Sequence, residues 1–260
     1  QRDQLDRPDI EVALLRSQRH LQLGWTPMLD AWGGRDDAPR ARCRPRRPKR
    51  HRSRPRYRRL YDRAVHRIRV LRPAANIFAF YDGRIDGYRF AEGPNWVDDG
   101  ALSLGISSYA VVDDGEALIY DTHVSVEHAR FIRKALEAQG VRVFTVVLSH
   151  WHLDHVAGTA AFRDSEVVAS KRTAELLAHN KAAIEDGSHA GLPPIDPLIL
   201  PTRVFLEREH LDIGRLHVEL IQADIHSYDA TVIWLAQQRL LLCGDTMEDT
   251  LTYVVEPEGF

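Results

Sequence analysis

The chain has 260 residues, and 44% of them are hydrophobic, which is enough apolar material for the core of a globular domain. It has no run of about eighteen apolar residues, which argues against a membrane-spanning helix and a membrane partner. Its two cysteines, Cys43 and Cys243, are too few for a disulfide framework. We therefore expect a cytoplasmic protein; the sequence does not specify its oligomeric state.

Residues 1–72 differ in composition from the rest of the chain. A helical pattern covers residues 10–23, whereas residues 40–72 hold sixteen Lys or Arg against one acid, Asp62. That is a local charge of +15 in a chain of net charge −2, so the remainder carries −17. The basic run is rich in Pro and has no apolar period. We interpret residues 1–72 as an appendage that is disordered or artefactual, the alternative being an arm that binds nucleic acid.

From residue 73 the pattern becomes regular. Alternating or continuous apolar runs predict strands at residues 77–81, 103–112, 116–120, 141–148, 166–169 and 203–206. Apolar residues at helical spacing predict helices at residues 126–139 and 173–185, with a further helix opening near Gly158.

The remaining segments are expected to be loops and hairpins. Residues 187–201 are rich in Pro and predict a long surface loop, of the kind that often borders a substrate. Turn residues at 113–115, 212–214 and 237–239 predict hairpins. Strands and helices are therefore mixed, which indicates an α/β (α+β) domain over residues 73–260.

The segment that follows the predicted strand at 141–148 carries three imidazoles and a carboxylate within six residues: His150, His152, Asp154 and His155. Histidines two residues apart on a loop can face one metal ion, and an adjacent Asp–His pair can hold a second ion nearby. Two further candidates each follow a predicted strand, at residues 216–223 and 240–244: His226 and Asp245.

In the type and order of these residues the chain resembles the metallo-β-lactamase superfamily of metal-dependent hydrolases, whose pattern is a His-x-His-x-Asp-His loop, a later His and then an Asp after a strand. The resemblance runs from about residue 76 to the C-terminus. It implies an αββα sandwich. Because the family has further strands and helices after the last Asp, it also implies that the sandwich is incomplete at the C-terminus and the chain truncated there.

The resemblance also implies a dinuclear metal site. The first ion would be held by His150, His152 and His226, the second by Asp154 and His155, with Asp245 bridging the two. Asp121, at the end of the predicted strand 116–120, would orient a ligand imidazole from behind. The expected cofactor is Zn²⁺, as one or two ions, with iron or manganese as alternatives at the second site.

One ligand of the second ion is missing from the pattern. The family supplies a further His well downstream of the bridging Asp, whereas no His follows His226 in this chain. We therefore expect one tight and one weak metal site. If both sites were tight, His123 and His128 would be the first substitutes to examine.

The ligands predict hydrolytic chemistry. Bound divalent ions lower the pKa of water from about 15.7 to about 7, so that hydroxide forms at neutral pH and attacks a carbonyl carbon or a phosphorus atom. Asp154 is the candidate catalytic residue, because its carboxylate would orient the hydroxide and accept its proton. Tyr228, two residues after His226, is a candidate substrate contact, with a packing role as the alternative.

The sequence therefore predicts a metallo-hydrolase that uses a metal-activated hydroxide on a small ester, lactone, thioester or lactam. A nuclease or phosphodiesterase of the same fold is one alternative, and an inactive fragment is another. The acidic remainder of the chain disfavours a nucleic-acid partner, since polyanions are repelled by negative charge.

Overall fold

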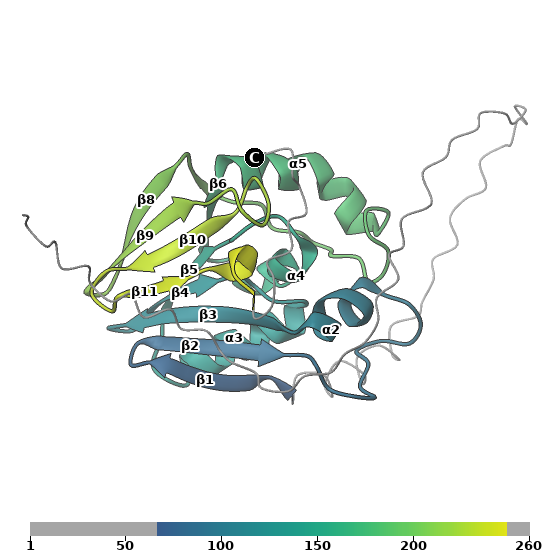
Figure 1. The fold of residues 1–260 in the computed structure, drawn as a ribbon, viewed down its shortest axis with the longest axis horizontal. Coiled ribbons are helices and arrows are strands. Elements are labelled where there is room, and N and C mark those ends of the chain that lie inside the picture. Colours follow the sequence, from purple (N-terminus) through teal and green to yellow (C-terminus); the bar gives the residue numbers. More distant parts are fainter. Residues whose placement is uncertain (1–66, 249–260) are drawn as a thin grey trace, which may run out of the picture.

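The computed structural model describes residues 67–248, which form two β-sheets packed face to face (Figure 1). The larger sheet runs in the order β1 (Arg69–Ala74), β2 (Ile77–Asp82), β3 (Ile106–Asp113), β4 (Glu116–Tyr120), β5 (Val143–Val147), β6 (Glu166–Ser170), β7 (Arg203–Phe205). The smaller sheet contains β11 (Leu240–Leu242), β10 (Thr231–Leu235), β9 (Leu216–Gln222) and β8 (Arg208–Ile213), in that order.

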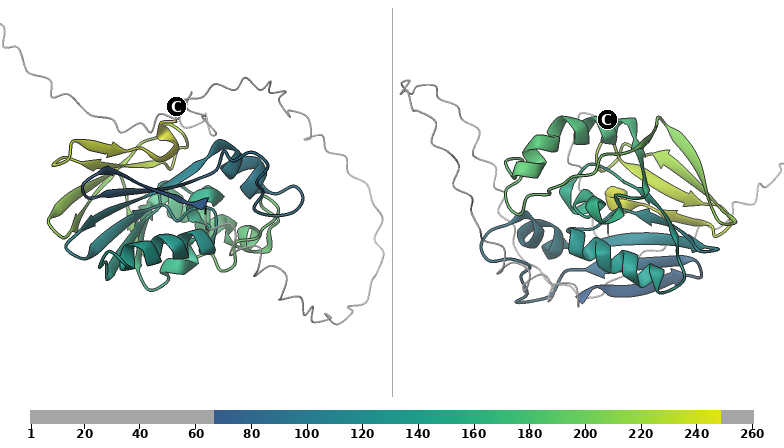
Figure 2. Two further views of the ribbon diagram at one scale, coloured as in Figure 1. Left: turned by 90° about the horizontal axis from the view of Figure 1, so that it is seen from below. Right: turned by 180° about the vertical axis from the view of Figure 1, so that it is seen from behind.

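The larger sheet changes from antiparallel to parallel at β4. Strands β1 to β4 pair in an antiparallel manner, and β4 to β7 pair in parallel. Parallel neighbours require crossover connections, and here these are helical. They are α3 (Val126–Glu137), then α4 (Leu153–Val156) with η3 (Thr159–Phe162), then α5 (Lys171–Asp186). The helices pack on the face of the larger sheet that points away from the smaller sheet (Figure 2).

The two long helices have sequence-encoded ends. The Ser125 hydroxyl accepts a hydrogen bond from the backbone N–H of His128 and so caps α3. Ser170 caps α5 in the same way, through the N–H of Thr173. Gly187 ends α5 in the left-handed conformation, at φ 81°, which glycine adopts without steric cost.

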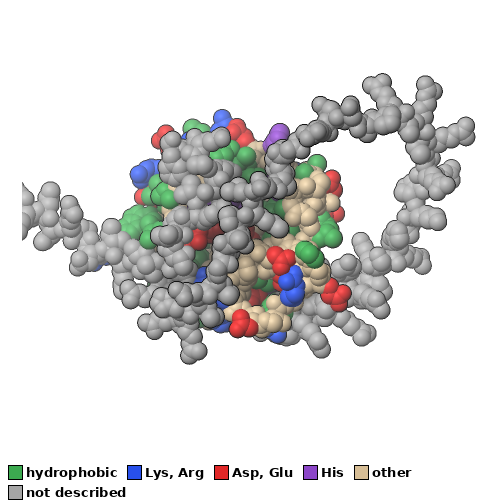
Figure 3. All heavy atoms as spheres, turned by 45° about the vertical axis from the view of Figure 1, so that its right-hand side comes forward, with side chains coloured by type: hydrophobic (Ala, Val, Ile, Leu, Met, Phe, Trp, Pro, Cys, Tyr) green, Lys and Arg blue, Asp and Glu red, His purple; other side chains and the backbone are tan. Residues whose placement is uncertain are grey.

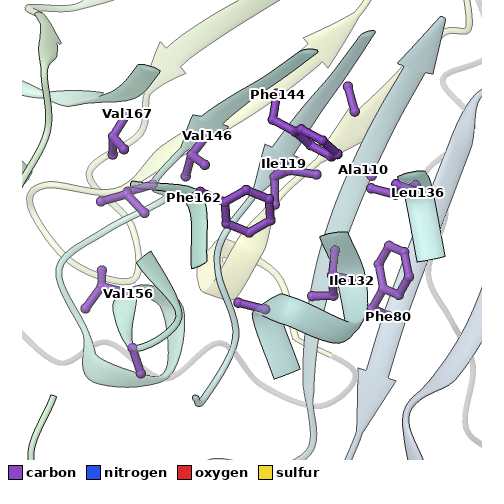
Figure 4. Close-up of a cluster of buried hydrophobic side chains, with 14 of the residues drawn as sticks. Phe80, Ala110, Ile119, Ile132, Leu136, Phe144, Val146, Val156, Phe162 and Val167 are labelled. Atoms are coloured by element: carbon purple, nitrogen blue, oxygen red, sulfur yellow. The ribbon is translucent and has the colours of Figure 1, made fainter. Parts of the chain in front are cut away.

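Alternation along the central strands divides their side chains between two cores. On β4, Leu118 and Tyr120 face the smaller sheet, whereas Ile119 faces the helices. Figure 4 shows the helix-side core, where side chains of the sheet meet those of α3, α4 and η3: Phe80, Ala110, Ile119, Ile132, Leu136, Phe144, Val146, Val156, Phe162 and Val167. Burial of each large apolar side chain contributes about 1.5–3 kcal/mol, so these two cores hold the layers together.

The mixed α/β class is confirmed, with two stacked sheets and helices outside the larger one. Within residues 67–248, no helix covers the outer face of the smaller sheet, so this part of the chain supplies three of the four layers of the expected sandwich. None of the helices in the same part has the length and hydropathy of a membrane span.

Two predicted elements differ from the structure. The strand predicted from residue 103 begins only at Ile106, because the preceding residues form the helical turns η2 (Val97–Ala101) and α2 (Leu102–Leu104). The helix predicted near Gly158 is a single 3₁₀ turn, η3, while a short helix, α4, lies inside the segment predicted to be a metal-binding loop. Apolar spacing could not separate these short turns from strands or loops.

The boundary predicted at residue 72 lies too far along the chain. Strand β1 pairs with β2 from Arg69 onward, and Ile68 is buried in the helix-side core. The guanidinium groups of Arg69 and Arg72 lie over aromatic rings of β2. The end of the basic run is therefore part of the folded domain. The rest of the predicted appendage, residues 1–66, lies outside the described residues, as do residues 249–260.

Candidate metal centre

The candidate ligands meet at one edge of the sandwich, because their strands end there. The His150 to His155 segment begins three residues after β5 and continues into α4. His226 lies on the connection between β9 and β10, and Asp245 lies on η4 (Gly244–Thr246), just after β11. Asp121 directly follows β4, the parallel neighbour of β5. Four separate connections thus deliver the six candidate ligands and Asp121 to one place.

The three histidines of the predicted first site converge. Nδ1 of His152 lies 2.8 Å from Nε2 of His150 and 3.2 Å from Nε2 of His226. All three nitrogens lie within 4.8 Å of one another. Ligand nitrogens that bind one tetrahedral zinc ion at about 2.0–2.1 Å are roughly 3.3 Å apart, so only small shifts separate this arrangement from a zinc site.

A second group forms around Asp245. Its Oδ2 lies 3.2 Å from Nε2 of His155, 4.0 Å from Nε2 of His150 and 3.8 Å from Nε2 of His226. The compact set is His150, His155 and Asp245, with ligand atoms within 4.8 Å of one another. The central position of Asp245 suits the predicted bridging role.

Asp154 is the one predicted ligand outside both compact sets. Its Oδ2 lies 3.7 Å from Nε2 of His155, so it borders the second set. The second compact set contains His150 in place of Asp154.

Asp121 is placed where the predicted orienting role requires it. Its Oδ2 lies 2.8 Å from Nδ1 of His155, and its Oδ1 accepts the backbone N–H of Ser149 at 2.7 Å. Asp121 has φ 68°, a left-handed conformation that Asp adopts more readily than most residues. One buried carboxylate therefore orients an imidazole and fixes the start of the ligand segment.

The surroundings of His150 and His152, two imidazoles of the predicted first site, favour their neutral form. Burial, reinforced by the nearby His155, lowers the pKa of His150 well below its usual range and that of His152 to about 3. Both rings are therefore neutral at pH 7, which is the form that coordinates a metal.

The second group behaves in the opposite way. Burial alone would lower the pKa of His155, but the carboxylates of Asp245, Asp154 and Asp121 outweigh it and raise this pKa well above its usual value. Burial would raise the pKa of Asp245, yet the neighbouring imidazoles, His155 first, lower it to about 2. Burial raises the pKa of Asp154. The group thus holds concentrated negative charge, with His155 as its counter-ion.

Several site residues were not predicted from the sequence. The Ser149 hydroxyl lies 2.8 Å from Nδ1 of His150, and the Asp229 carboxylate accepts the backbone N–H of Trp151 at 3.0 Å. The imidazole of His189 meets the indole of Trp151 edge to face, with ring centroids 5.1 Å apart. His189 belongs to the predicted loop 187–201, which does border the site. Only the close spacing of Asp229 to His226 could have suggested that residue.

Tyr228 and the two alternative histidines, His123 and His128, make contacts of their own. Tyr228 is half-buried, with the guanidinium of Arg172 over its ring at 5.7 Å. His123 and His128 are fully buried and stacked on each other, and Nε2 of His128 lies 3.1 Å from a carboxylate oxygen of Asp82. Neither histidine belongs to the compact ligand sets of the described residues, so neither replaces the missing second-site ligand in this arrangement.

Comparison with known proteins identifies the family and the fold. The family model of the metallo-beta-lactamase superfamily matches residues 103–259. Among solved structures, the DIM-1 metallo-beta-lactamase aligns with a TM-score of 0.50 and 22% sequence identity, covering 68% of this chain and 69% of that chain. A metallo-beta-lactamase from Pontibacter korlensis aligns with a TM-score of 0.50 and 20% identity, covering 67% of this chain and 70% of that one.

A third similar structure, VMB-1, has a TM-score of 0.50 and 17% identity and covers 67% of this chain and 68% of its own. No curated protein sequence gave a significant match. At these identities the solved structures support the fold, and the family model spans more than half of the chain. The chain belongs to the metallo-β-lactamase superfamily.

Proposed function

We propose that this chain is a metal-dependent hydrolase with a dinuclear zinc site that cleaves a small ester, lactone, thioester or lactam. The observation that carries the proposal is the convergence of His150, His152 and His226, whose nitrogens lie close to the spacing of zinc ligands. Membership of the superfamily supports a hydrolase in general.

The donor set fits zinc. It consists of imidazole nitrogens and carboxylate oxygens, which this borderline metal prefers. His150 and His152 are neutral at pH 7 because burial lowers their pKa values. Three ligands leave a fourth position open, as catalytic zinc sites do. We assign His150, His152 and His226 to the first ion. We assign Asp154 and His155 to the second, with Asp245 shared.

When bound, zinc would supply Lewis acidity, which acidifies water and polarises a carbonyl oxygen. The residues of the chain would accept protons and orient the ligands. Asp154 borders the second ligand set, and partial burial raises the pKa of its carboxyl group, a shift in the direction that makes it a better proton acceptor. Asp121 keeps a proton on Nδ1 of His155, which leaves Nε2 directed at Asp245.

The charges on the described surface bear on the class of substrate. The face shown in Figure 3 has acidic, basic and hydrophobic side chains of the described residues interspersed, so its visible part does not form a basic track. Arg69 and Arg72, from the end of the basic run, are stacked on Tyr81 and Phe78 within the sheet. These features favour a small substrate over a nucleic acid. We keep a cytoplasmic setting in the proposal because of the low cysteine content.

The test is metal analysis combined with hydrolysis assays. Zinc content is measured in the wild type and in the double variant His150→Ala, His152→Ala. A matched control is His210→Ala, His217→Ala, which removes two exposed histidines of the smaller sheet. We expect zinc to be lost only from the first double variant, together with turnover of chromogenic ester, lactone, thioester and lactam substrates. Equal zinc content in all three proteins would refute the assignment.

A further inference from the structure

Asp229 is completely buried in the connection between β9 and β10, three residues after His226. A buried carboxylate is strongly unfavourable unless its oxygens accept hydrogen bonds. Here both oxygens do so, and their donors come from three different parts of the fold.

The donors flank all three ligands of the first site. Oδ2 of Asp229 accepts the backbone N–H of Trp151 at 3.0 Å, and Trp151 stands between His150 and His152 in the chain. Oδ1 accepts the hydroxyl of Ser227 at 2.8 Å, and Ser227 follows His226. A single carboxylate thus ties the His150 to His152 segment to the segment that carries His226.

The same carboxylate is anchored to a helix. Oδ2 of Asp229 also accepts the hydroxyl of Thr173, at 2.9 Å, in the first turn of α5. The backbone carbonyl of Asp229 accepts a hydrogen bond from the hydroxyl of Ser170 at 3.2 Å. Since Ser170 also caps α5, Asp229 is fixed relative to a sixteen-residue helix that packs on the larger sheet.

Asp229 and Asp121 restrain His150 from its two sides. Asp121 accepts the N–H of Ser149, and Asp229 accepts the N–H of Trp151, so the backbone amides directly before and after the ring-bearing residue are both held. The N–H of Thr231 completes the junction by donating to the Ser149 carbonyl at 2.7 Å. Asp121 also contacts His155 of the second site. Asp229, in contrast, accepts hydrogen bonds from Trp151 and Ser227, which are next to the histidines of the first site.

We infer that Asp229 is a positioning residue that sets the zinc affinity of the first site by fixing the separation of its two ligand-bearing segments. The inference rests on the proposed metal site but concerns a residue that is not a ligand. Zinc tolerates deviations of only about 0.2 Å in its bond lengths, so segments that must be ordered on binding lower the affinity. Partners that orient ligands in this way typically contribute about 10- to 100-fold to metal affinity.

The test is zinc affinity of the 260-residue chain, measured by competition with a chromophoric chelator. Asp229→Ala removes the bonds that the carboxylate accepts from Trp151, Ser227 and Thr173 and should weaken zinc binding at the first site by about 10- to 100-fold. Asp229→Asn is a rescue variant, because its carbonyl can accept from Trp151 and Thr173 while the Ser227 hydroxyl turns to accept from the amide. Its affinity should stay within about fivefold of the wild type.

Asp98→Ala is a matched control for the loss of a buried carboxylate. Asp98 accepts bonds from the N–H groups of Phe90 and Ala91 and from the Asn95 amide, all within residues 90–98. This variant should lower the melting temperature as Asp229→Ala does, but keep the zinc affinity of the wild type. The visible spectrum of cobalt(II) substituted at the first site should change in Asp229→Ala and stay unchanged in Asp98→Ala.

The outcomes separate the inference from the proposed function. If the wild type binds no zinc, the proposed metal site is wrong and the inference is wrong with it. If the wild type binds zinc and Asp229→Ala binds it equally tightly, only the inference is overturned. If Asp229→Ala does not fold, the zinc affinity of Ser227→Ala is measured instead. We expect this variant to bind zinc about fivefold more weakly than the wild type, and an unchanged zinc affinity would overturn the inference.

Discussion

The carboxylate of Asp121 and the imidazole of His155 are fully buried and joined by a hydrogen bond of 2.8 Å between Oδ2 and Nδ1. Because the carboxylate can only accept, Nδ1 carries the proton and Nε2 is the nitrogen that is left for a metal ion. Nε2 of His155 does point to Asp245, at 3.2 Å. The tautomer of one candidate ligand on α4 is therefore set by a residue that directly follows β4.

Replacing Asp121 by Asn should impair the second metal site without breaking the fold. Asn tolerates the left-handed backbone at this position, and its carbonyl can still accept the N–H of Ser149. Its amide, however, would donate to Nδ1 of His155 and move the ring proton to Nε2. We expect about 10- to 100-fold weaker binding of the second ion.

Calorimetric metal titration measures this effect. Asp113→Asn is a suitable control, since Asp113 is a buried carboxylate that binds Arg215 at the far end of the β3–β4 hairpin. The control should bind both ions as the wild type does. An Asp121→Asn variant with an unchanged second binding event would contradict the assigned tautomer.

Binding of the second ion should depend strongly on pH. The pKa of His155 is raised above its ordinary value, so the ring is protonated at neutral pH in the metal-free protein and an ion must displace that proton. The apparent affinity should therefore rise with pH, by about tenfold per unit until the raised pKa is passed.

Binding of the first ion should respond differently. The pKa values of His150 and His152 are lowered, so these rings release no proton near pH 7 and the affinity should be nearly constant between about pH 6.5 and 8. Metal titrations at several pH values, in buffers with different heats of ionisation, give the number of protons released at each step. Equal proton release in both steps would disprove this distinction.

Gly158→Ala should strongly destabilise the protein. A Cβ atom at this position would lie 2.0 Å from the carbonyl oxygen of Thr122 and 2.4 Å from Cβ of Ala129, so α3 or the ligand segment would have to move. Overpacking of this kind typically costs about 1–3 kcal/mol and sometimes more. Gly100→Ala, where nothing lies within 4 Å, should leave the free energy of unfolding unchanged or slightly higher. Urea denaturation compares the two, and similar midpoints would show that the contact is not restrictive.

Deletion of residues 1–66 should leave the fold and the candidate site intact, whereas deletion of residues 1–72 should destabilise the protein. Removing residues 1–66 leaves β1, Ile68 and all candidate ligands in place, so zinc content should not change. Removing residues 1–72 also removes most of β1 and exposes the edge of β2, which should lower the melting temperature and promote aggregation. Thermal unfolding and size-exclusion chromatography of the two shortened proteins check this difference. Equal behaviour would mean that β1 contributes little to stability.

The sequence by itself determined the types of the candidate ligands and most of the helices and strands. Three imidazoles and a carboxylate within six residues indicate a metal site because few other uses require them at that spacing. The helix at 126–139 and the strand at 116–120 could be predicted because the spacing of apolar residues and the terminal residues agree. For α3 these terminal residues are Ser125 at its start and Gly140, three residues after its last residue. Periodicity is a local property, so local sequence is sufficient for it.

Only the tertiary structure decided which residues act together. His226 and Asp245 lie far from His150 in the chain, and their approach depends on the packing of the smaller sheet on the larger one. Asp229 carries no local pattern, and its role follows from donors on a loop and a helix. Strand β1 was not predicted because its arginines interrupt the apolar pattern that indicates a strand. Its strand conformation is stabilised by pairing with β2, which the local sequence does not reveal. Hydrogen bonds and repulsions between distant residues depend on coordinates, and no local spacing encodes them.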